Sequence, residues 1–147
     1  MIRSQLRRFR RSAAGASAVE FALVVTPFIL LVFGVTEYGR LLWTRTAIQE
    51  TAIATARCMG VKQTSCATTG AYSQSKTNTF IQSQAHSWSI TIPNSAVALD
   101  QSTSCQGVSG FSRVAINVTF QTAVPILLGS LANGVALSAV ACFPNQS

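Results

Sequence analysis

One run of residues without charge dominates the hydrophobic pattern of the chain. Sixteen residues, Phe21 to Thr36, separate Glu20 from Glu37. Counted from Ala16, where small and weakly polar residues begin, the segment has 21 residues, and 21 residues make about 32 Å of helix, enough for a bilayer core of about 30 Å. Its large apolar side chains surround the whole cylinder, which favours a membrane-spanning helix over the core helix of a soluble domain.

Beyond this run the pattern becomes that of a helix with one apolar face. No glycine or proline occurs between Gly39 and Arg57. One stripe of small and apolar side chains repeats at helical spacing: Leu41, Ile48, Ala52 and Ala56. Arg45 falls on the same face and interrupts it. We therefore predict that the helix continues to about Gly60, with its second half packed on a folded domain.

Residues 61–147 predict a small domain with one short helix and three strands. A Ser, Thr and Gln-rich loop is followed by a helix expected over Tyr72–Gln84. Alternation with period two predicts strands at 87–92, 114–121 and 135–142. The apolar connector Pro125–Gly129 is expected to pack against the sheet, with contact to lipid or a partner as the alternative. The predicted fold is α+β: a long N-terminal helix, transmembrane and then amphipathic, followed by a small antiparallel β-sheet domain.

The positive charge is concentrated at the N-terminus. The net charge is +7 although only 10% of the residues are charged. Five arginines and no acid precede residue 12: Arg3, Arg7, Arg8, Arg10 and Arg11. Because Lys and Arg favour the cytoplasmic side, this leader predicts a cytoplasmic N-terminus and an exported C-terminal domain. Tyr38 and Trp43 stand where an interfacial aromatic belt is expected. A nucleic-acid partner is not expected.

The residues around the apolar run argue against an ordinary secretory signal. Small residues lie before the run, at 13–18, whereas residues 37–40 after it make a poor cleavage site. Residues 7–9 match a twin-arginine signal only weakly, because no good cut site follows. Glu20 is costly near the start of a spanning helix. Its carboxylate is therefore expected either to reach the headgroups or to be kept for a partner.

The order of these features resembles the class III signal of type IV pilins and pseudopilins. A basic leader is followed by Gly15, small residues 16–19, Glu20-Phe21 and an apolar helix. The string from Ala13 to Arg40, with AVEFALV, TPFILLVFG and TEYGR, is similar to the TadE-like pseudopilins of the Flp/Tad (tight adherence) pilus machinery. The resemblance implies that a prepilin peptidase cuts between Gly15 and Ala16, which makes Glu20 the fifth residue of the mature chain.

The same resemblance implies a location, a set of partners and a division of the chain. It implies a pilin-like, single-pass protein of the bacterial inner membrane with a periplasmic C-terminal domain; whether the protein enters the pilus stays open. The implied partners are the prepilin peptidase, the major Flp-type pilin, other minor pseudopilins, the inner-membrane pilus platform and the lipid bilayer. The expected parts are a cleaved leader (1–15), a transmembrane helix (16–36), its periplasmic continuation (37–60) and a small α+β domain (61–147).

Four cysteines lie on the predicted exported side, where disulfides persist: Cys58, Cys66, Cys105 and Cys142. Four cysteines allow three pairings. We favour Cys58 with Cys66, because it closes a short loop after the helix, and Cys105 with Cys142, because it ties two strand regions together. A zinc site is the weaker alternative, since no Cys-x2-Cys pair occurs and His86 is the only histidine.

The sequence gives little support to catalysis. Asp100 is the one acid of the predicted exported domain, and no phosphate-binding glycine loop or nucleophile with a base and an orienting group is evident. We expect no enzymatic activity and no cofactor. The main hypothesis is a minor pseudopilin that primes, anchors or tips a Flp/Tad pilus. The alternatives are an uncleaved signal-anchor protein whose domain binds an envelope partner and, less favoured, an anchored hydrolase.

Overall fold

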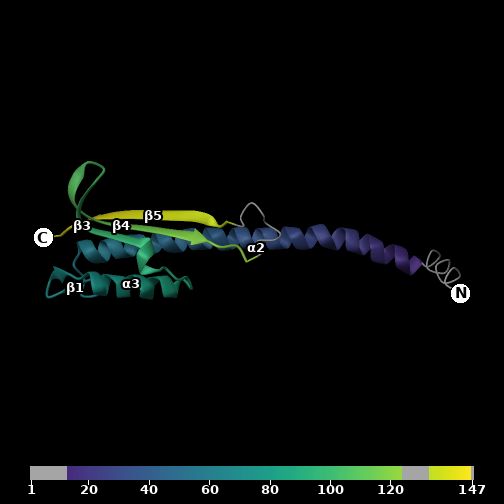
Figure 1. Cartoon of the computed structure of the whole chain (residues 1–147), viewed down its shortest axis with the longest axis horizontal. Helices are drawn as coiled ribbons and strands as arrows, with labels where there is room; N and C mark the ends of the chain where they lie inside the picture. The colour runs from purple at the N-terminus through teal and green to yellow at the C-terminus, as the bar shows by residue number, and fades with distance from the viewer. Residues whose placement is uncertain (1–12, 124–132, 147) are drawn as a thin grey trace. The chain divides into compact units, whose positions relative to one another are not determined.

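The structure is a computed structural model that describes residues 13–123 and 133–146, with side-chain exposure from Gly15 onward. In chain order the elements are helix α2 (Ala13–Gly60), strands β1 (Ala67–Thr68) and β2 (Ala71–Tyr72), helix α3 (Gln74–Ser87), a 3-10 turn η1 (Asn94–Ala96), and strands β3 (Val97–Cys105), β4 (Val108–Phe120) and β5 (Val135–Pro144) (Figure 1). The chain divides into two compact units, residues 1–39 and residues 40–147, so the boundary falls within α2.

The first unit contains the apolar part of α2. Its large side chains are exposed all round the helix, as in Phe21 (68%) and Leu23 (71%). Pro27 lies inside this stretch without ending the helix. The hydroxyls of Thr26 and Thr36 donate to the carbonyls of Ala22 and Val32, 2.8 Å away in each case. Both hydroxyls are thereby satisfied within the helix, as an apolar solvent requires.

The second unit is built on a three-stranded antiparallel sheet in the order β3-β4-β5. Strands β4 and β5 pair over ten consecutive positions, from Phe111 opposite Pro144 to Phe120 opposite Val135. One face carries the buried side chains of Val114, Ile116 and Leu137. The predicted α+β fold with a small antiparallel sheet is therefore confirmed, and the second and third predicted strands correspond to β4 and β5.

The core lies between the sheet and the helices. Ile48, Ala52 and Ala56 of α2 are at most 1% exposed and pack in one cluster with Val114 and Ile116 of β4. Ala85 of α3 joins the same cluster, and Leu41 packs at its edge. Figure 1 shows the strands along one side of this part of α2 and α3 along the other. The predicted stripe on α2 is thus its buried face.

The end of helix α3 and the turn after it occupy a segment predicted as a strand. The sequence predicted a strand at 87–92, and this prediction is wrong. The amides of Ser89 and Ile90 donate to the carbonyls of His86 and Ala85 (2.9 and 3.0 Å), and Ser89 has φ 57°. This is a Schellman ending, in which a left-handed residue is followed by an apolar residue that packs back on the helix. Ile90 and Ile92 are apolar because they pack on the core. The alternation of apolar and polar residues over 87–92 therefore does not indicate a β-strand.

Helix α2 ends in the same way. The amide of Gln63 donates to the carbonyl of Cys58 and that of Lys62 to Met59, with Lys62 at φ 55°. Gly60 is therefore the last helical residue, where the sequence predicted the stop, but the left-handed residue of the ending is Lys62. Gly60 is small for another reason, its contact with the end of β5.

Strand β3, the first strand of the three-stranded sheet, was not predicted from the sequence. Val97 and Leu99 pack on the core, but the pattern is lost from Asp100 to Ser104, where the pairing with β4 is irregular. Gln106 and Gly107 have φ 52° and 84°, as a two-residue hairpin turn requires. Figure 1 shows the hairpin tip curling away from the helix side of the sheet.

The two disulfides join the cysteines as the sequence favoured. Cys58 in the last turn of α2 is bonded to Cys66, and Cys105 of β3 to Cys142 of β5. The second bond links two strands that are not neighbours, because β4 lies between them. It therefore fixes the curl of the hairpin tip across the sheet. The predicted connector Pro125–Gly129 lies outside the described residues.

Candidate processing and assembly segment

The predicted cleavage site lies within the described part of α2. This part begins at Ala13, so the bond between Gly15 and Ala16 is helical. Gly15 weakens the helix locally, by about 1 kcal/mol relative to alanine. Presenting the bond to a protease in extended form requires the helix to unwind around Gly15.

Glu20 lies one helical turn after Ala16. Both residues are exposed, and their spacing of four places their side chains on the same face of the helix. A free amino group at Ala16 would therefore stand close to the Glu20 carboxylate of its own chain. Phe21, the neighbour of Glu20 in the predicted motif, is 68% exposed. The structure thus brings Ala16 and Glu20 together on one side of the helix.

The apolar helix that carries these residues is compatible with a single-pass membrane anchor. Over the described part of the chain, the stretch from Gly15 to Gly60 is the one helix long and apolar enough to cross a membrane, and its most apolar window is not buried at all. The arginines predicted to set its orientation, Arg7, Arg8, Arg10 and Arg11, lie outside the described residues.

Aromatic and cationic residues follow the apolar stretch on α2. The guanidinium of Arg40 lies 5.6 Å from the ring centroid of Phe120, at the end of β4. Trp43 packs edge-on against Trp88, and its indole N–H donates to the carbonyl of Trp88. Sequence reasoning singled out Trp43 but missed Trp88, because it assigned Trp88 to a strand of the sheet.

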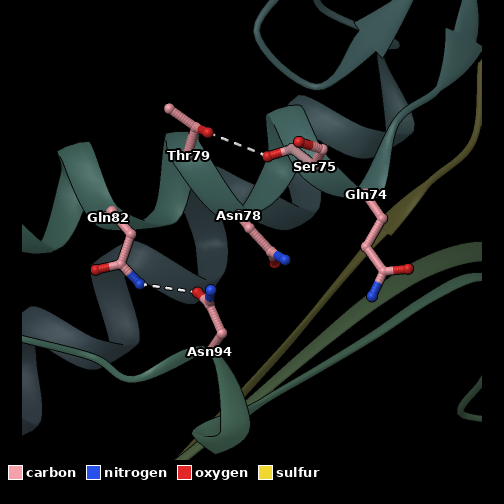
Figure 2. Close-up of a pocket in the computed structure, with 6 residues that line it drawn as sticks. All are labelled: Gln74, Ser75, Asn78, Thr79, Gln82 and Asn94. Carbon is pink, nitrogen blue, oxygen red and sulfur yellow. Dashed lines mark hydrogen bonds between the residues drawn. The ribbon is translucent and has the colours of Figure 1, made fainter.

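The domain surface also carries pockets without concentrated charge. The larger of two on α3 holds about 500 Å³. Six neutral polar side chains line it: Gln74, Ser75, Asn78, Thr79, Gln82 and Asn94. Figure 2 shows Gln82 bonded to Asn94 across this pocket, at 3.0 Å. Its lining lacks any ionisable group, so the pocket provides no acid, base or charged nucleophile.

The titratable groups of the domain are dispersed. All four cysteines are bonded in disulfides, which leaves no thiolate among them for a metal. Among the described residues, no three His, Cys, Asp or Glu side chains gather as metal ligands. Burial raises the pKa of Tyr72 above its ordinary value, and the hydrogen bond with Thr77 offsets only part of this shift. The phenol of Tyr72 is therefore neutral at physiological pH.

The protein belongs to the class of α+β proteins in which a small domain follows one long apolar N-terminal helix. Residues 15–57 match the model of a protein family described as TadE-like protein. Over this segment the chain is TadE-like, which confirms the resemblance seen in its sequence, and the match associates it with Flp/Tad pili and their assembly. Comparison with curated proteins and with solved structures gives no match.

Proposed function

We propose that the protein is a minor pseudopilin that assists the assembly of Flp/Tad type IV pili by priming, anchoring or tipping the filament. The observation that carries the proposal is the family match, which begins at Gly15 and extends along α2 to Arg57. It covers the predicted cleavage site, the motif Glu20-Phe21 and the whole apolar stretch, and it leaves out the arginine-rich leader.

The first step of the proposed function is removal of residues 1–15 by a prepilin peptidase at the cytoplasmic face of the inner membrane. The leader arginines hold this end of the chain at the anionic lipid surface. Gly15 has no side chain to clash with the walls of a protease cleft. Gly15 supports this step also because glycine weakens the helix at the point where it must be unwound for cleavage.

Cleavage creates the group that Glu20 would bind. The new ammonium of Ala16 lies one turn from the Glu20 carboxylate. A negative charge near a helix N-terminus is also favoured by the helix dipole. In a bundle of apolar helices, the same carboxylate can pair with the ammonium of a neighbouring subunit. A buried charge pair of this kind fixes the register between helices.

The partners follow from this mechanism. The exposed apolar face of α2 packs on the helices of the major Flp-type pilin and other minor pseudopilins, after release from the inner-membrane platform. The C-terminal domain lies in the periplasm and acts by contact, without catalysis. The alternative function is that of an uncleaved signal anchor whose domain binds an envelope partner; the neutral pocket on α3 is the surface that favours it.

The mass of the membrane-purified chain separates these two functions. In cells that contain the pilus machinery, we expect a chain that begins at Ala16 and has lost residues 1–15. The same chain produced in cells without the peptidase should keep Met1, and Gly15→Arg should block cleavage in the first cells. An intact Met1 in cells that contain the active peptidase contradicts the pseudopilin proposal and favours the signal anchor.

A further inference from the structure

The only two tryptophans of the protein, Trp43 and Trp88, lie against each other. Their ring centroids are 5.3 Å apart with an interplanar angle of 65°, an edge-on pair. The indole N–H of Trp43 donates to the backbone carbonyl of Trp88 at 3.1 Å. That carbonyl belongs to the C-cap of α3, where helical carbonyls lack an amide partner. The contact therefore fastens the end of α3 to α2.

This pair remains open to the surroundings. Trp43 is 56% exposed, and its neighbour Leu42 is 42% exposed. Trp88 is partly buried, and no described residue accepts a hydrogen bond from its indole N–H. The pair therefore presents two large apolar rings with one polar N–H left for the solvent or for another acceptor. Such amphipathic rings concentrate at the boundary between hydrocarbon and water.

The pair also lies at the right distance along α2 from the apolar stretch. A bilayer core takes about 20 residues of helix, which extends from Glu20 to Arg40. Trp43 follows Arg40 by three residues, or about 4.5 Å of helix rise. If the core is counted to Thr36 instead, the rise to Trp43 is about 10 Å. The headgroup layer on each side of the core is about 5 to 8 Å thick. Helical side chains point back toward the N-terminus, and therefore toward the core. The Trp43 ring thus reaches the headgroup layer whether the core ends at Thr36 or at Arg40.

We propose that Trp43 and Trp88 form one interfacial anchor, through which the C-terminal end of α3 rests on the headgroups of the bilayer. The proposal depends on the assignment of the apolar part of α2 as a membrane-spanning helix. It goes beyond an aromatic belt on that helix, because Trp88 is 45 residues further along the chain and belongs to another element. Arg40 and Arg45 on the adjoining turns add positive charge suited to anionic headgroups.

The anchor holds the domain in a fixed orientation at the membrane surface before assembly. With α3 held at the surface, the domain cannot tilt freely relative to the bilayer. Extraction of the helix into a filament would then have to break the contact of Trp88 with lipid. The membrane would thereby hold unassembled subunits in one orientation.

Quenching of tryptophan emission tests the proposal, because the pair accounts for all the tryptophan in the chain. The full chain is inserted into phosphatidylcholine vesicles containing phosphatidylglycerol, with a nitroxide either on the headgroup or deep in the acyl chains. Trp43→Phe leaves Trp88 as the reporter, and Trp88→Phe leaves Trp43. For both reporters we expect the headgroup nitroxide to lower the emission roughly twofold and the deep nitroxide to lower it less.

The control places a tryptophan at the opposite end of β4 from Phe120. Val108 is 59% exposed at the start of this strand, beside the hairpin turn. Val108→Trp in a chain that also carries Trp43→Phe and Trp88→Phe should show no quenching. Circular dichroism and intact disulfides confirm that each variant is folded.

The outcomes separate the anchor from the membrane assignment. Failure of the chain to float with the vesicles overturns the spanning helix itself. Chains that float overturn the anchor alone if Trp88 is insensitive to both nitroxides, or if the Val108→Trp control is quenched as strongly as Trp88. Blue-shifted but unquenched Trp88 emission, which reports burial against a second copy of the chain, overturns it as well.

Discussion

Gly60 and Phe143 lie so close that no side chain fits between them. A Cβ added to Gly60 would stand 2.6 Å from Cδ1 of Phe143 and 2.9 Å from the carbonyl oxygen of Pro144. The Gly60 carbonyl also accepts a hydrogen bond from the amide of Gln146 at 2.9 Å. The last turn of α2 is therefore joined to the end of β5 by direct contact of their backbones.

The first prediction is that Gly60→Ala destabilises the domain. Helix propensity alone would favour alanine by about 1 kcal/mol. The clash with Phe143 and with the backbone of Pro144 should outweigh this gain, because overpacking costs about 1 to 3 kcal/mol. Thermal unfolding of the full chain in detergent, followed by the near-ultraviolet circular dichroism of the tryptophan pair, measures the change.

Gly39→Ala is the matched control on the same helix. Beyond the adjacent residues and the helix's own backbone, no atom of the described residues lies within 4 Å of a Cβ built on Gly39, so this substitution should leave the melting temperature unchanged or raise it. Equal effects of both variants would show that Gly60 has no special contact with β5.

Sequence reasoning located Gly60 but gave only part of the reason for it. A glycine after a long helix predicts a stop, and α2 does end there. The contact with Phe143 joins residues more than eighty positions apart, and no local pattern contains that information. The apolar run and the stripe through Ile48 were predictable because both repeat along one helix.

A second prediction concerns the end of α3. Ser89 has φ 57°, a conformation that costs a residue with a Cβ about 1 kcal/mol. Ser89→Gly should therefore stabilise the domain by about this amount. Ser83→Gly, at an exposed position inside the same helix, should destabilise it by about 0.5 kcal/mol. Melting temperatures that move in the same direction for both variants would contradict the Schellman ending.

The wrong strand at 87–92 shows why alternation was misleading there. Apolar residues at Trp88, Ile90 and Ile92 match a period of two, but a Schellman ending also places apolar residues just after a helix. The clue that separates the two cases is the left-handed Ser89, which a sequence signals clearly only when the residue is glycine. In β3 the opposite error occurred, because its irregular pairing hides the alternation beyond Leu99.

The third prediction compares the two disulfides. Cys58 and Cys66 are separated by 8 residues, Cys105 and Cys142 by 37. Since loop-closure entropy grows with loop length, loss of the first bond should cost about 2.5 kcal/mol and loss of the second about 4 kcal/mol. Replacing both cysteines of each pair by serine in the full chain allows the two melting temperatures to be compared. A larger loss for the Cys58–Cys66 pair would contradict this order.

The fourth prediction concerns Asn145, which ties the C-terminal segment to the hairpin. Its amide Nδ2 donates to the carbonyl of Gln101 at 2.7 Å, and its Oδ1 accepts from the hydroxyl of Ser112 at 2.5 Å. Ser112 is fully buried. Asn145→Ala should cost about 1 to 3 kcal/mol, because it leaves the Ser112 hydroxyl with a single weak contact, 3.4 Å from the Gln101 carbonyl.

A double variant identifies the source of that loss. With Ser112→Ala the hydroxyl is gone, so adding Asn145→Ala should cost less than it does in the original chain. Independent, additive losses in the melting measurements would mean that the two side chains are not coupled.

The last prediction separates cleavage from assembly at Glu20. Because Glu20 lies one turn beyond the cleavage bond and is exposed, Glu20→Ala should leave removal of residues 1–15 intact. It should also ease membrane insertion, by less than the roughly 2.5 to 3.5 kcal/mol that a carboxylate costs at the centre of a spanning helix, because Glu20 lies near its start. Assembly should fail nevertheless, because the ammonium of Ala16 loses its acceptor.

The measurements are the N-terminal mass and the yield of pili sheared from the cells. The control is Glu50→Ala, because Glu50 is an exposed acid of the same helix beyond the apolar stretch. Normal piliation with Glu20→Ala would show that the charge pair does not hold the subunits in register.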